Sequence, residues 1–330
     1  MFSLTISLSV IHLHSSAIMI IAIILEHLSI KKKSRARASR PDSSPPRKDD
    51  SREYWINANP LNRLLVVVAY RFRSSRLVNL VWKEKSLLDS IGNICIIKVS
   101  NNNKIAEAHN IRFVSENTTV PVPRIYCAFV RKGKTYIVES RIRGHDARWG
   151  WIHRSEESKA RILHQLRGMV EQIHNIPRPD GEAGVASAIG GPVYDPRLPG
   201  DPFWGPFPSL RDFNRALLND CCDPYTYTCT TAASVPVGIL DMMEWFKRQP
   251  DELLVFSHGD LSSLNIMVDG DKVTGIVDWE MAGWFPPYWD YVNAWHANFR
   301  NLWWQNEVDK FMTPRPDDLE MDGIRRRHFG

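Results

Sequence analysis

The spacing of apolar residues in the first half of the chain predicts a small unit that combines strands with one helix. Short apolar runs predict three strands, at residues 94–99, 125–130 and 135–138. Apolar positions three and four residues apart predict a helix over 101–116, between the first strand and the second. The earlier apolar runs at 64–69 and 77–82 fit strands or an opening helix equally well, so their structure stays open.

After residue 140 the pattern becomes mainly helical. Apolar residues with helical spacing predict helices over residues 155–173, 209–218, 239–248 and 288–304. A short strand at 253–256 separates the last two helices. The Pro- and Gly-rich segment 177–208 is too long for a simple connector, so we expect it to pack beside a functional site.

The N-terminal segment, residues 1–54, differs from the rest. Residues 1–25 carry no charged side chain and are followed by Lys31, Lys32 and Lys33. A segment of this kind within residues 1–30 can act as a single membrane anchor, and its basic flank would leave the remaining domain in the cytoplasm. The alternatives are a non-native extension from a misplaced start codon and a poorly ordered apolar tail. The Arg-, Ser- and Pro-rich stretch 34–54 is typical of a linker.

The composition fits a soluble globular protein, but the charge is unevenly distributed. Of the 330 residues, 43% are hydrophobic and 24% charged, which suits one large domain or two lobes. Residues 1–199 hold 31 Lys and Arg against 17 Asp and Glu, whereas residues 200–330 hold 11 against 20. Eight of the basic residues lie in 31–48, which predicts a solvated tail and no nucleic-acid partner. The acidic second part suits a metal ion, a cationic substrate or an ordinary surface.

The cysteines form no recognisable framework. There are five of them, at Cys95, Cys127, Cys221, Cys222 and Cys229, and no C-x-x-C pair occurs. An odd number without paired spacing predicts reduced thiols in an intracellular protein.

The strongest signal for chemistry lies in residues 255–280. Asp260 is followed five residues later by Asn265, and Asp278 comes at the far end of a predicted hairpin with strands at 266–268 and 273–277. The hairpin returns the chain on itself, so we expect the three side chains to converge. Phosphoryl transfer needs a carboxylate to accept the hydroxyl proton, and an amide and a second carboxylate to hold Mg²⁺.

A second candidate pair precedes this stretch. Lys98 lies inside the predicted strand 94–99, where an unpaired ammonium group is costly to bury. Glu107 lies in the first turns of the following helix and could reach back to it. Such a pair holds a lysine over nucleotide phosphates in kinase-type sites. The alternative is a surface glutamate and a lysine that extends to solvent.

Other polar residues have simpler explanations. His164 and His174 are ten residues apart, which is no metal-ligand spacing, so both are expected on a polar helix face. The three arginines at 325–327 are expected to form a solvated basic tip. Asp290 is predicted to brace the loop that carries Asp260 through a hydrogen bond.

The set formed by Lys98, Glu107, His258-Gly259-Asp260, Asn265 and Asp278 resembles the aminoglycoside phosphotransferase family of the protein-kinase-like superfamily. The runs V-P-V-P-R-I-Y, G-P-V-Y-D-P-R and F-S-H-G-D-L-S-S-L-N-I-M-V are similar to its fungal members. The resemblance covers residues 92–311.

The resemblance implies an α+β, protein-kinase-like two-lobed fold. A small N-lobe sheet with one helix would occupy residues 55–140, and a mainly helical C-lobe residues 141–330. The implied activity is transfer of the γ-phosphoryl group of ATP, with Mg²⁺, to a hydroxyl of a small molecule such as an aminoglycoside, a sugar or an amino alcohol. A monomer is expected.

The resemblance also assigns roles to individual residues. Asp260 would be the catalytic base, and Asn265 and Asp278 would hold Mg²⁺. Lys98, held by Glu107, would contact the α- and β-phosphates. Glu139, Ser140 and Arg141 would lie at the adenine ring. His258 and Asp290 would support the catalytic loop without reacting.

Two departures from the kinase pattern limit the implied function. The segment 90–93 offers only Gly92 where a G-x-G-x-x-G loop would cover the phosphates. Ser262 lies where protein kinases place a lysine, which argues against a protein substrate. The missing glycines leave a catalytically silent, kinase-like binding module as the alternative, and Mg²⁺-dependent ATP binding distinguishes the two.

Overall fold

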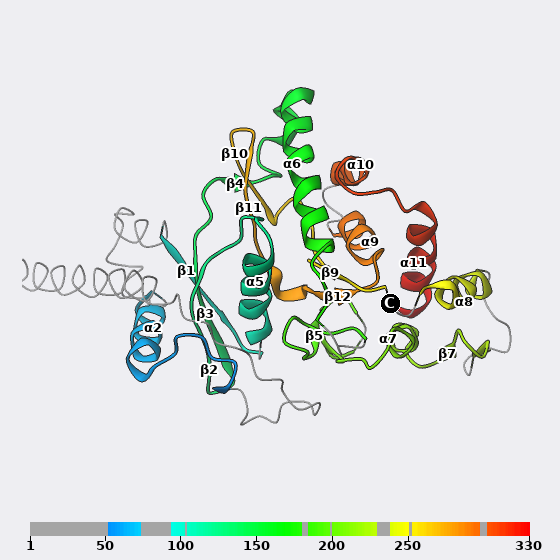
Figure 1. Ribbon diagram of the computed structural model, residues 1–330, viewed down its shortest axis with the longest axis horizontal. Coiled ribbons are helices and arrows are strands. Elements are labelled where there is room, and N and C mark those ends of the chain that lie inside the picture. Colours follow the sequence, from blue (N-terminus) through cyan, green and yellow to red (C-terminus); the bar gives the residue numbers. More distant parts are fainter. Residues whose placement is uncertain are drawn as a thin grey trace, which may run out of the picture. The chain divides into compact units, whose positions relative to one another are not determined.

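The computed structural model describes residues 52–73, 94–102, 104–179, 184–198, 200–229, 238–250, 253–297 and 302–330 (Figure 1). Two compact units share the chain: residues 1–105 with 124–141, and residues 106–123 with 142–330. The helices are α2 (Pro60–Arg73), α5 (Ile105–Asn117), α6 (Glu156–His174), α7 (Leu210–Leu217), α8 (Ile239–Arg248), α9 (Trp289–His296), α10 (Leu302–Phe311) and α11 (Pro316–Phe329), with 3₁₀ turns η2 (Trp151–His153) and η3 (Trp279–Met281). The strands are β1 (Cys95–Ser100), β2 (Ile125–Arg131), β3 (Lys134–Ser140), β4 (His145–Asp146), β5 (Val193–Tyr194), β6 (Phe203–Trp204), β7 (Cys222–Asp223), β8 (Thr228–Cys229), β9 (Val255–Ser257), β10 (Ile266–Asp269), β11 (Lys272–Ile276) and β12 (Gly283–Phe285).

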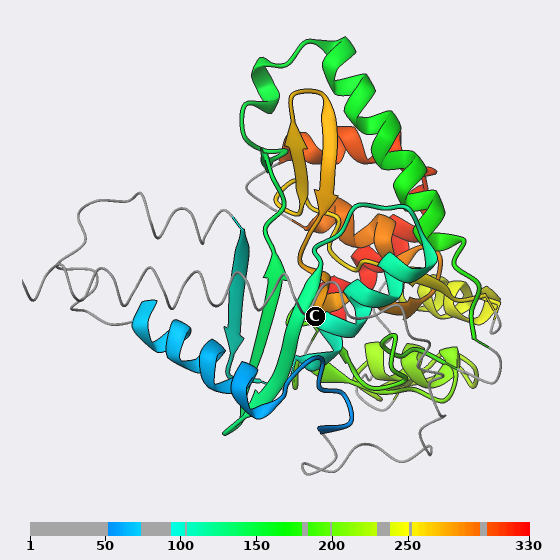
Figure 2. The same cartoon turned by 60° about the vertical axis from the view of Figure 1, so that its left-hand side comes forward.

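The first unit is built on an antiparallel sheet in the order β1-β3-β2, shown with its strands side by side in Figure 2. β2 and β3 form the predicted hairpin, with Arg131 paired to Lys134. Both turn residues have positive φ, 52° at Lys132 and 73° at Gly133, as a two-residue turn of the primed type requires. The turn therefore fixes the register of β2 and β3, and β1 pairs with the other edge of β3, with Ile96 and Cys95 opposite Glu139 and Ser140.

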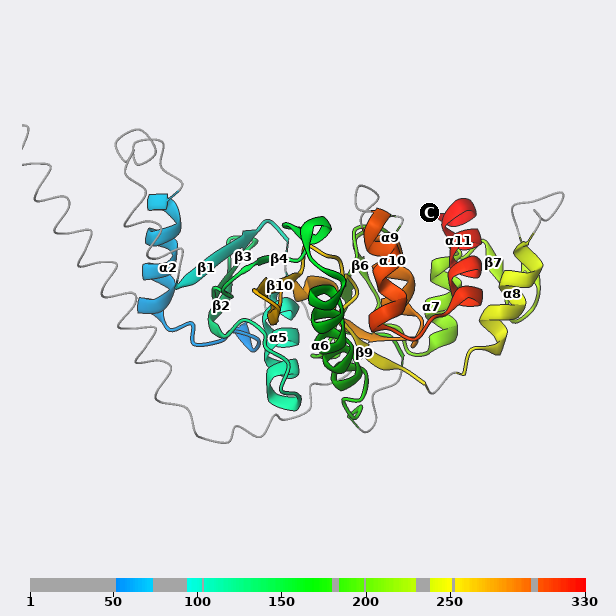
Figure 3. The same ribbon diagram turned by 90° about the horizontal axis from the view of Figure 1, so that it is seen from above.

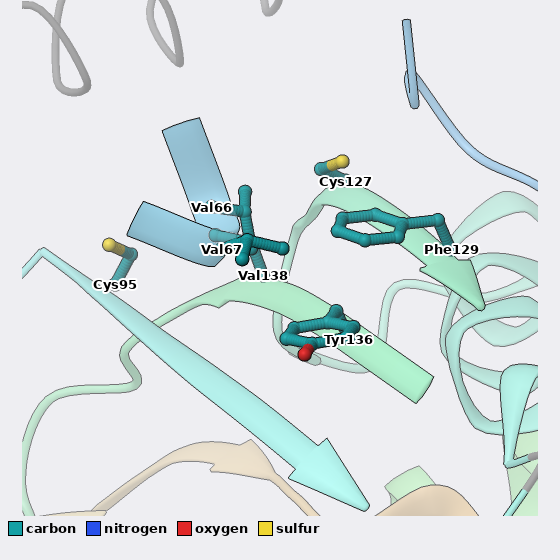
Figure 4. Packing of buried hydrophobic residues seen from close by; sticks show 7 residues of the cluster. All are labelled: Val66, Val67, Cys95, Cys127, Phe129, Tyr136 and Val138. Atoms are coloured by element: carbon teal, nitrogen blue, oxygen red, sulfur yellow. The ribbon is translucent and has the colours of Figure 1, made fainter. Parts of the chain in front are cut away.

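The core of this unit forms where α2 packs on the sheet (Figure 4). The apolar run at 64–69, for which the sequence allowed a strand or a helix, lies in helix α2. Pro60 occupies the first position of this helix, where the N–H group that proline lacks would have no partner within the helix. The run at 77–82 lies outside the described residues. The buried side chains are apolar or aromatic, and they are Val66, Val67, Cys95, Cys127, Phe129, Tyr136 and Val138.

The second unit combines short strand pairs with most of the helices (Figure 3). α6 begins at Ser155, whose hydroxyl accepts the backbone N–H of Ser158, and it packs on β9 and β11. β9 pairs with β12, and β10 pairs with both β11 and β4. α9 contacts α10 and α11, so the C-terminal helices gather behind these strands.

The helix α5 groups differently from the expected N-lobe. From Ala106 onward it belongs to the second unit, where Phe113 packs on Phe256 of β9 and Trp284 of β12. The predicted apolar face of this helix is buried, with Ala108 and Val114 fully inaccessible.

Two further expectations concern the cysteines and the N-terminus. Cys222 is disulfide-bonded, so the expectation that every cysteine is a reduced thiol is wrong; β7 and β8 set Cys222 opposite Cys229 in their backbone register. The candidate anchor within residues 1–30 lies outside the described residues. No helix in the described ranges is long and apolar enough to cross a bilayer.

Candidate active site

The loop that carries Asp260 begins directly after β9. The apolar strand Val255–Ser257 pairs with β12 and ends at a buried His258-Gly259. Gly259 has φ +80°, and a Cβ at this position would lie 2.5 Å from the carbonyl oxygen of Met281. Only glycine therefore allows the chain to turn here and direct Asp260 away from the strand.

His258 links the two ends of the candidate site. Its Nδ1 accepts the backbone N–H of Asp260 at 3.1 Å, and its Nε2 lies 3.0 Å from the carbonyl oxygen of Val277. Because a carbonyl oxygen can only accept, this geometry fits a neutral ring with its proton on Nε2. Burial lowers the pKa of His258, which favours the same neutral form. The contacts suit a structural role for the ring.

Asp290 of α9 holds the same loop from the other side. Its carboxylate, almost fully buried, accepts the backbone N–H groups of His258 at 3.1 Å and Gly259 at 2.7 Å. His174 at the end of α6 contributes a third contact of 2.9 Å. Burial alone would raise the pKa of Asp290, but the hydrogen bond and charge of His174 and the Gly259 N–H outweigh it and leave that pKa lowered. The expectation that His174 is an ordinary polar-face residue is therefore wrong.

Asn265 is locked onto Asp260. The amide nitrogen of Asn265 donates to the carbonyl oxygen and to the Oδ2 of Asp260, both at 2.9 Å. Burial raises the pKa of Asp260, although the nearby Arg197 opposes this shift. Because its nitrogen is committed to Asp260, the amide oxygen of Asn265 is the atom that a cation would take.

Asp278 is placed beside Asn265 by the backbone of its neighbour. The Val277 N–H donates to the Asn265 carbonyl oxygen at 2.9 Å, while its own carbonyl oxygen meets His258. Asp278 follows in a left-handed conformation, with φ 67° and ψ 65°. For a residue with a Cβ this conformation costs about 1–3 kcal/mol, which surrounding contacts must offset.

Asn110 of α5 supplies such contacts. Its buried amide nitrogen donates to the carbonyl oxygens of Trp279 at 3.1 Å and Ala282 at 2.9 Å. Its amide oxygen accepts the backbone N–H of Ala188, in the Pro- and Gly-rich segment 177–208, at 3.1 Å. Asn110 therefore fixes the 3₁₀ turn that follows Asp278, a role that no local sequence pattern indicates.

The donor set fits a magnesium ion that shares its ligands with a nucleotide. Asn265 and Asp278 offer one amide oxygen and one carboxylate, and Mg²⁺ in phosphotransferase sites takes few protein ligands because phosphates and water supply the rest. Among the residues that the structure describes, no group of three or more His, Cys, Asp and Glu could hold a metal by itself. A site completed by phosphate oxygens is consistent with both facts.

Arg197 is a further residue that sequence reasoning missed. It lies in the loop between β5 and β6, donates from Nη2 to the Gly259 carbonyl oxygen at 2.7 Å, and places Nη1 3.8 Å from Oδ1 of Asp260. Asp195, two residues earlier, binds the guanidinium through Oδ1 at 2.8 Å and Oδ2 at 2.6 Å. The G-P-V-Y-D-P-R run ends in this arginine, but no neighbouring residue in the sequence indicates that its side chain reaches Asp260.

The first unit holds the predicted nucleotide-binding residues Lys98, Glu139, Ser140 and Arg141. Lys98 Nζ lies 3.6 Å from Oε1 of the buried Glu139, a partner that the sequence did not suggest. The backbone N–H of Ser140 donates to Arg124, and that of Arg141 donates to Ile94. Both N–H groups are therefore already hydrogen-bonded within this unit. The predicted contact with an adenine ring would have to come from other groups of these residues. Glu107 is buried in the second unit, and its pairing with Lys98 stays a prediction.

The model of the phosphotransferase enzyme family matches residues 101–322. A comparison with curated proteins found no match.

Among solved structures, a thermostable mutant of aminoglycoside phosphotransferase APH(4)-Ia, in ternary complex with AMP-PNP and hygromycin B, is 16% identical with a TM-score of 0.50, over 70% of this chain and 76% of that chain. Aminoglycoside phosphotransferase APH(3'')-Id from Streptomyces rimosus, in complex with ADP and streptomycin, is 15% identical with a TM-score of 0.44, over 72% of this chain and 86% of that chain. At this identity the first likeness concerns the fold alone, and it confirms the predicted α+β, protein-kinase-like class.

Proposed function

The chain belongs to the phosphotransferase enzyme family, and from this premise we propose that it transfers the γ-phosphoryl group of ATP, in a Mg²⁺-dependent reaction, to a hydroxyl of a small molecule. The observation that carries the proposal is the linked set of Asp260, Asn265 and Asp278. One amide joins the first two, and one backbone hydrogen bond places the third beside them.

The chemistry follows from the position of each group. As the acceptor oxygen forms its bond to the γ-phosphorus, the bond from that phosphorus to the bridging oxygen breaks, and ADP leaves. Asp260 accepts the proton that the acceptor hydroxyl loses. Mg²⁺ held by Asn265 and Asp278 would neutralise charge on the phosphates. Lys98, held by Glu107, would contact the α- and β-phosphates.

The remaining assignments are finer proposals. Glu139, Ser140 and Arg141 would border the adenine ring through groups other than the two N–H groups that the sheet uses. The likeness to fungal members rests on the sequence runs alone. We take the protein to act as a monomer.

Acceptor-stimulated ADP release tests the proposal. The wild type and Asp260→Asn are offered a panel of small hydroxyl compounds, and ATP binding is measured in parallel. Loss of the base should lower transfer by about 10²-fold or more while ATP still binds, since general-base catalysis contributes in that range. Equal transfer by the two proteins would remove Asp260 from the reaction. Absence of ATP binding in the wild type would favour the silent binding module.

A further inference from the structure

Two arginines lie on segments that contact or support the catalytic loop, and each pairs with a carboxylate that is more deeply buried than its own side chain. The side chain of Arg197 is 25% exposed, whereas that of its partner Asp195 is 3% exposed. The ion pair is therefore neutral overall, but the part of it that reaches the surface belongs mainly to Arg197.

The second arginine arrives through α9. Asp290 holds the catalytic loop, and Asn293, one helical turn later on the same face, accepts from Nη2 of Arg326 at 2.8 Å. Helices α9 and α11 contact one another, as Figure 3 shows. Arg326 thus lies about one turn of helix, roughly 5 Å along the axis, from the anchor of the catalytic loop.

Arg326 repeats the arrangement of Arg197. Its Nε donates to Oδ2 of Asp322 at 2.6 Å, and its side chain is 24% exposed against 1% for Asp322. Asp322 also binds the almost fully buried Arg325 at 2.7 Å, so two guanidinium groups share this carboxylate. The expectation of a solvated tip at residues 325–327 is therefore wrong for Arg325 and Arg326.

His296 reports the resulting field. This exposed residue lies one turn beyond Asn293 at the end of α9. Its pKa is lowered first by desolvation, then by Arg326, with Arg325 and Arg197 acting in the same direction against Asp322. Arg197 of the segment between β5 and β6 and Arg326 of α11 therefore both lie within electrostatic reach of His296.

We propose that the acceptor is a hydroxyl compound that carries an anionic group, a carboxylate or a phosphate, and that Arg197 and Arg326 bind this group while the hydroxyl faces Asp260. The inference rests on the proposed function. Guanidinium groups match the two-oxygen edge of carboxylates and phosphates, and they repel an ammonium group. A polycationic acceptor would meet the exposed edges of both arginines, because Asp195 and Asp322, the carboxylates that pair with them, are buried, and Asp260 is left to face the hydroxyl.

Matched acceptors test this inference. Glycerate is compared with glycerol, and a hexose phosphate with the free hexose, while hygromycin B serves as the polycation. We expect the anionic member of each pair to have the higher kcat/KM. A neutral or polycationic acceptor that reacts as well as the anionic ones would overturn the inference.

Variants of Arg326 test whether this residue causes the preference for anionic acceptors. Arg326→Gln should raise the KM for the anionic acceptor by about ten-fold or more, which is the loss of one charge-assisted hydrogen bond, and Arg326→Lys should restore part of it. Neither change should alter ATP affinity. Arg248→Gln, on the exposed face of α8, is the matched control and should change neither constant. An equal loss for charged and neutral acceptors would show a structural effect only, and would contradict the inference.

Binding without turnover separates this inference from the proposed function. Thermal shifts of the nucleotide-free protein are recorded with the same pairs. Stabilisation by glycerate but not glycerol, lost in Arg326→Gln, would support the anion site even if neither ATP binding nor transfer were found, and the proposed function alone would then fail. Equal shifts within each pair would count against the anion site.

Discussion

Both units of the protein bury apolar side chains, but the second also buries a connected polar network. The core of the first unit consists of apolar and aromatic side chains, such as Val66, Phe129 and Val138, which pack without a specific direction. The interior of the second unit contains a catalytic-loop network, which we define as His174, His258, Gly259, Asp260, Asn265 and Asp290, joined by hydrogen bonds of 2.7–3.1 Å. The first interior should respond to changes in volume, and the second to the loss of a single donor or acceptor.

The largest loss of stability is expected where a substitution keeps the volume of the side chain and changes only its hydrogen bonding. Asp290→Asn keeps the side-chain size but places an amide group against the donors from His258, Gly259 and His174. We expect a loss of about 3 kcal/mol or more in the free energy of unfolding, because each buried donor left unpaired costs about 1–3 kcal/mol. Phe129→Leu in the first unit removes part of a buried ring without a polar change and should cost about 1–2 kcal/mol. Urea unfolding of both variants measures the two losses in the free energy of unfolding. Equal losses would contradict the distinction between the apolar core and the polar network.

A smaller effect is expected at Asn110, which lies next to the network. Asn110→Ala removes three hydrogen bonds and should lower the free energy of unfolding by about 1–3 kcal/mol. It should also weaken Mg²⁺-dependent ATP binding, since the turn after Asp278 loses its support. Asn117→Ala is the matched control, because Asn117 is exposed on the same helix and bonds only within it. It should cost less than about 0.5 kcal/mol. A similar loss of ATP affinity in both variants would refute the positioning role.

The smallest effect concerns pH. The pKa of His258 is lower in the folded protein than in the unfolded chain, so its neutral form stabilises the fold above the unfolded pKa, and this contribution is lost as the pH falls from about 6.5 towards the folded value. The slope for one such group is at most about 1.4 kcal/mol per pH unit. Urea unfolding between pH 7 and pH 5 measures it. His258→Gln should flatten the dependence, while Phe129→Leu should leave it unchanged; an unchanged slope in His258→Gln would assign it to other groups.

Local sequence signals were sufficient for much of the fold. The predicted strands at 266–268 and 273–277 are found as β10 and β11, and the helix over 239–248 is found with the same limits. Each depends on neighbours within one turn or one hairpin. Asp260, Asn265 and Asp278 were also predicted to converge, because a short hairpin brings their positions together and the chemistry needs that spacing.

Contacts between distant segments were not predictable in the same way. Arg197 and Gly259 are 62 positions apart, and Arg326 and Asn293 are 33 apart. Asp322 pairs with Arg325 and Arg326 at helical spacing on α11, but the burial of these side chains depends on packing against other helices, among them α9. His174 was misjudged for the same reason, since its partner Asp290 is 116 residues away.

The proposed reaction requires Asp278 to hold Mg²⁺ for a bound nucleotide. Calorimetry of ATP binding, with and without Mg²⁺, on the wild type, Asp278→Ala and Asp271→Ala tests it most directly. Asp271 lies on the same hairpin, is 39% exposed and binds Arg161, Arg154 and Ser158, so its variant controls for the loss of one carboxylate. We predict Mg²⁺-dependent binding in the wild type and in Asp271→Ala, and its collapse in Asp278→Ala. Equal Mg²⁺-dependent binding by all three proteins, or none by the wild type, would contradict the account.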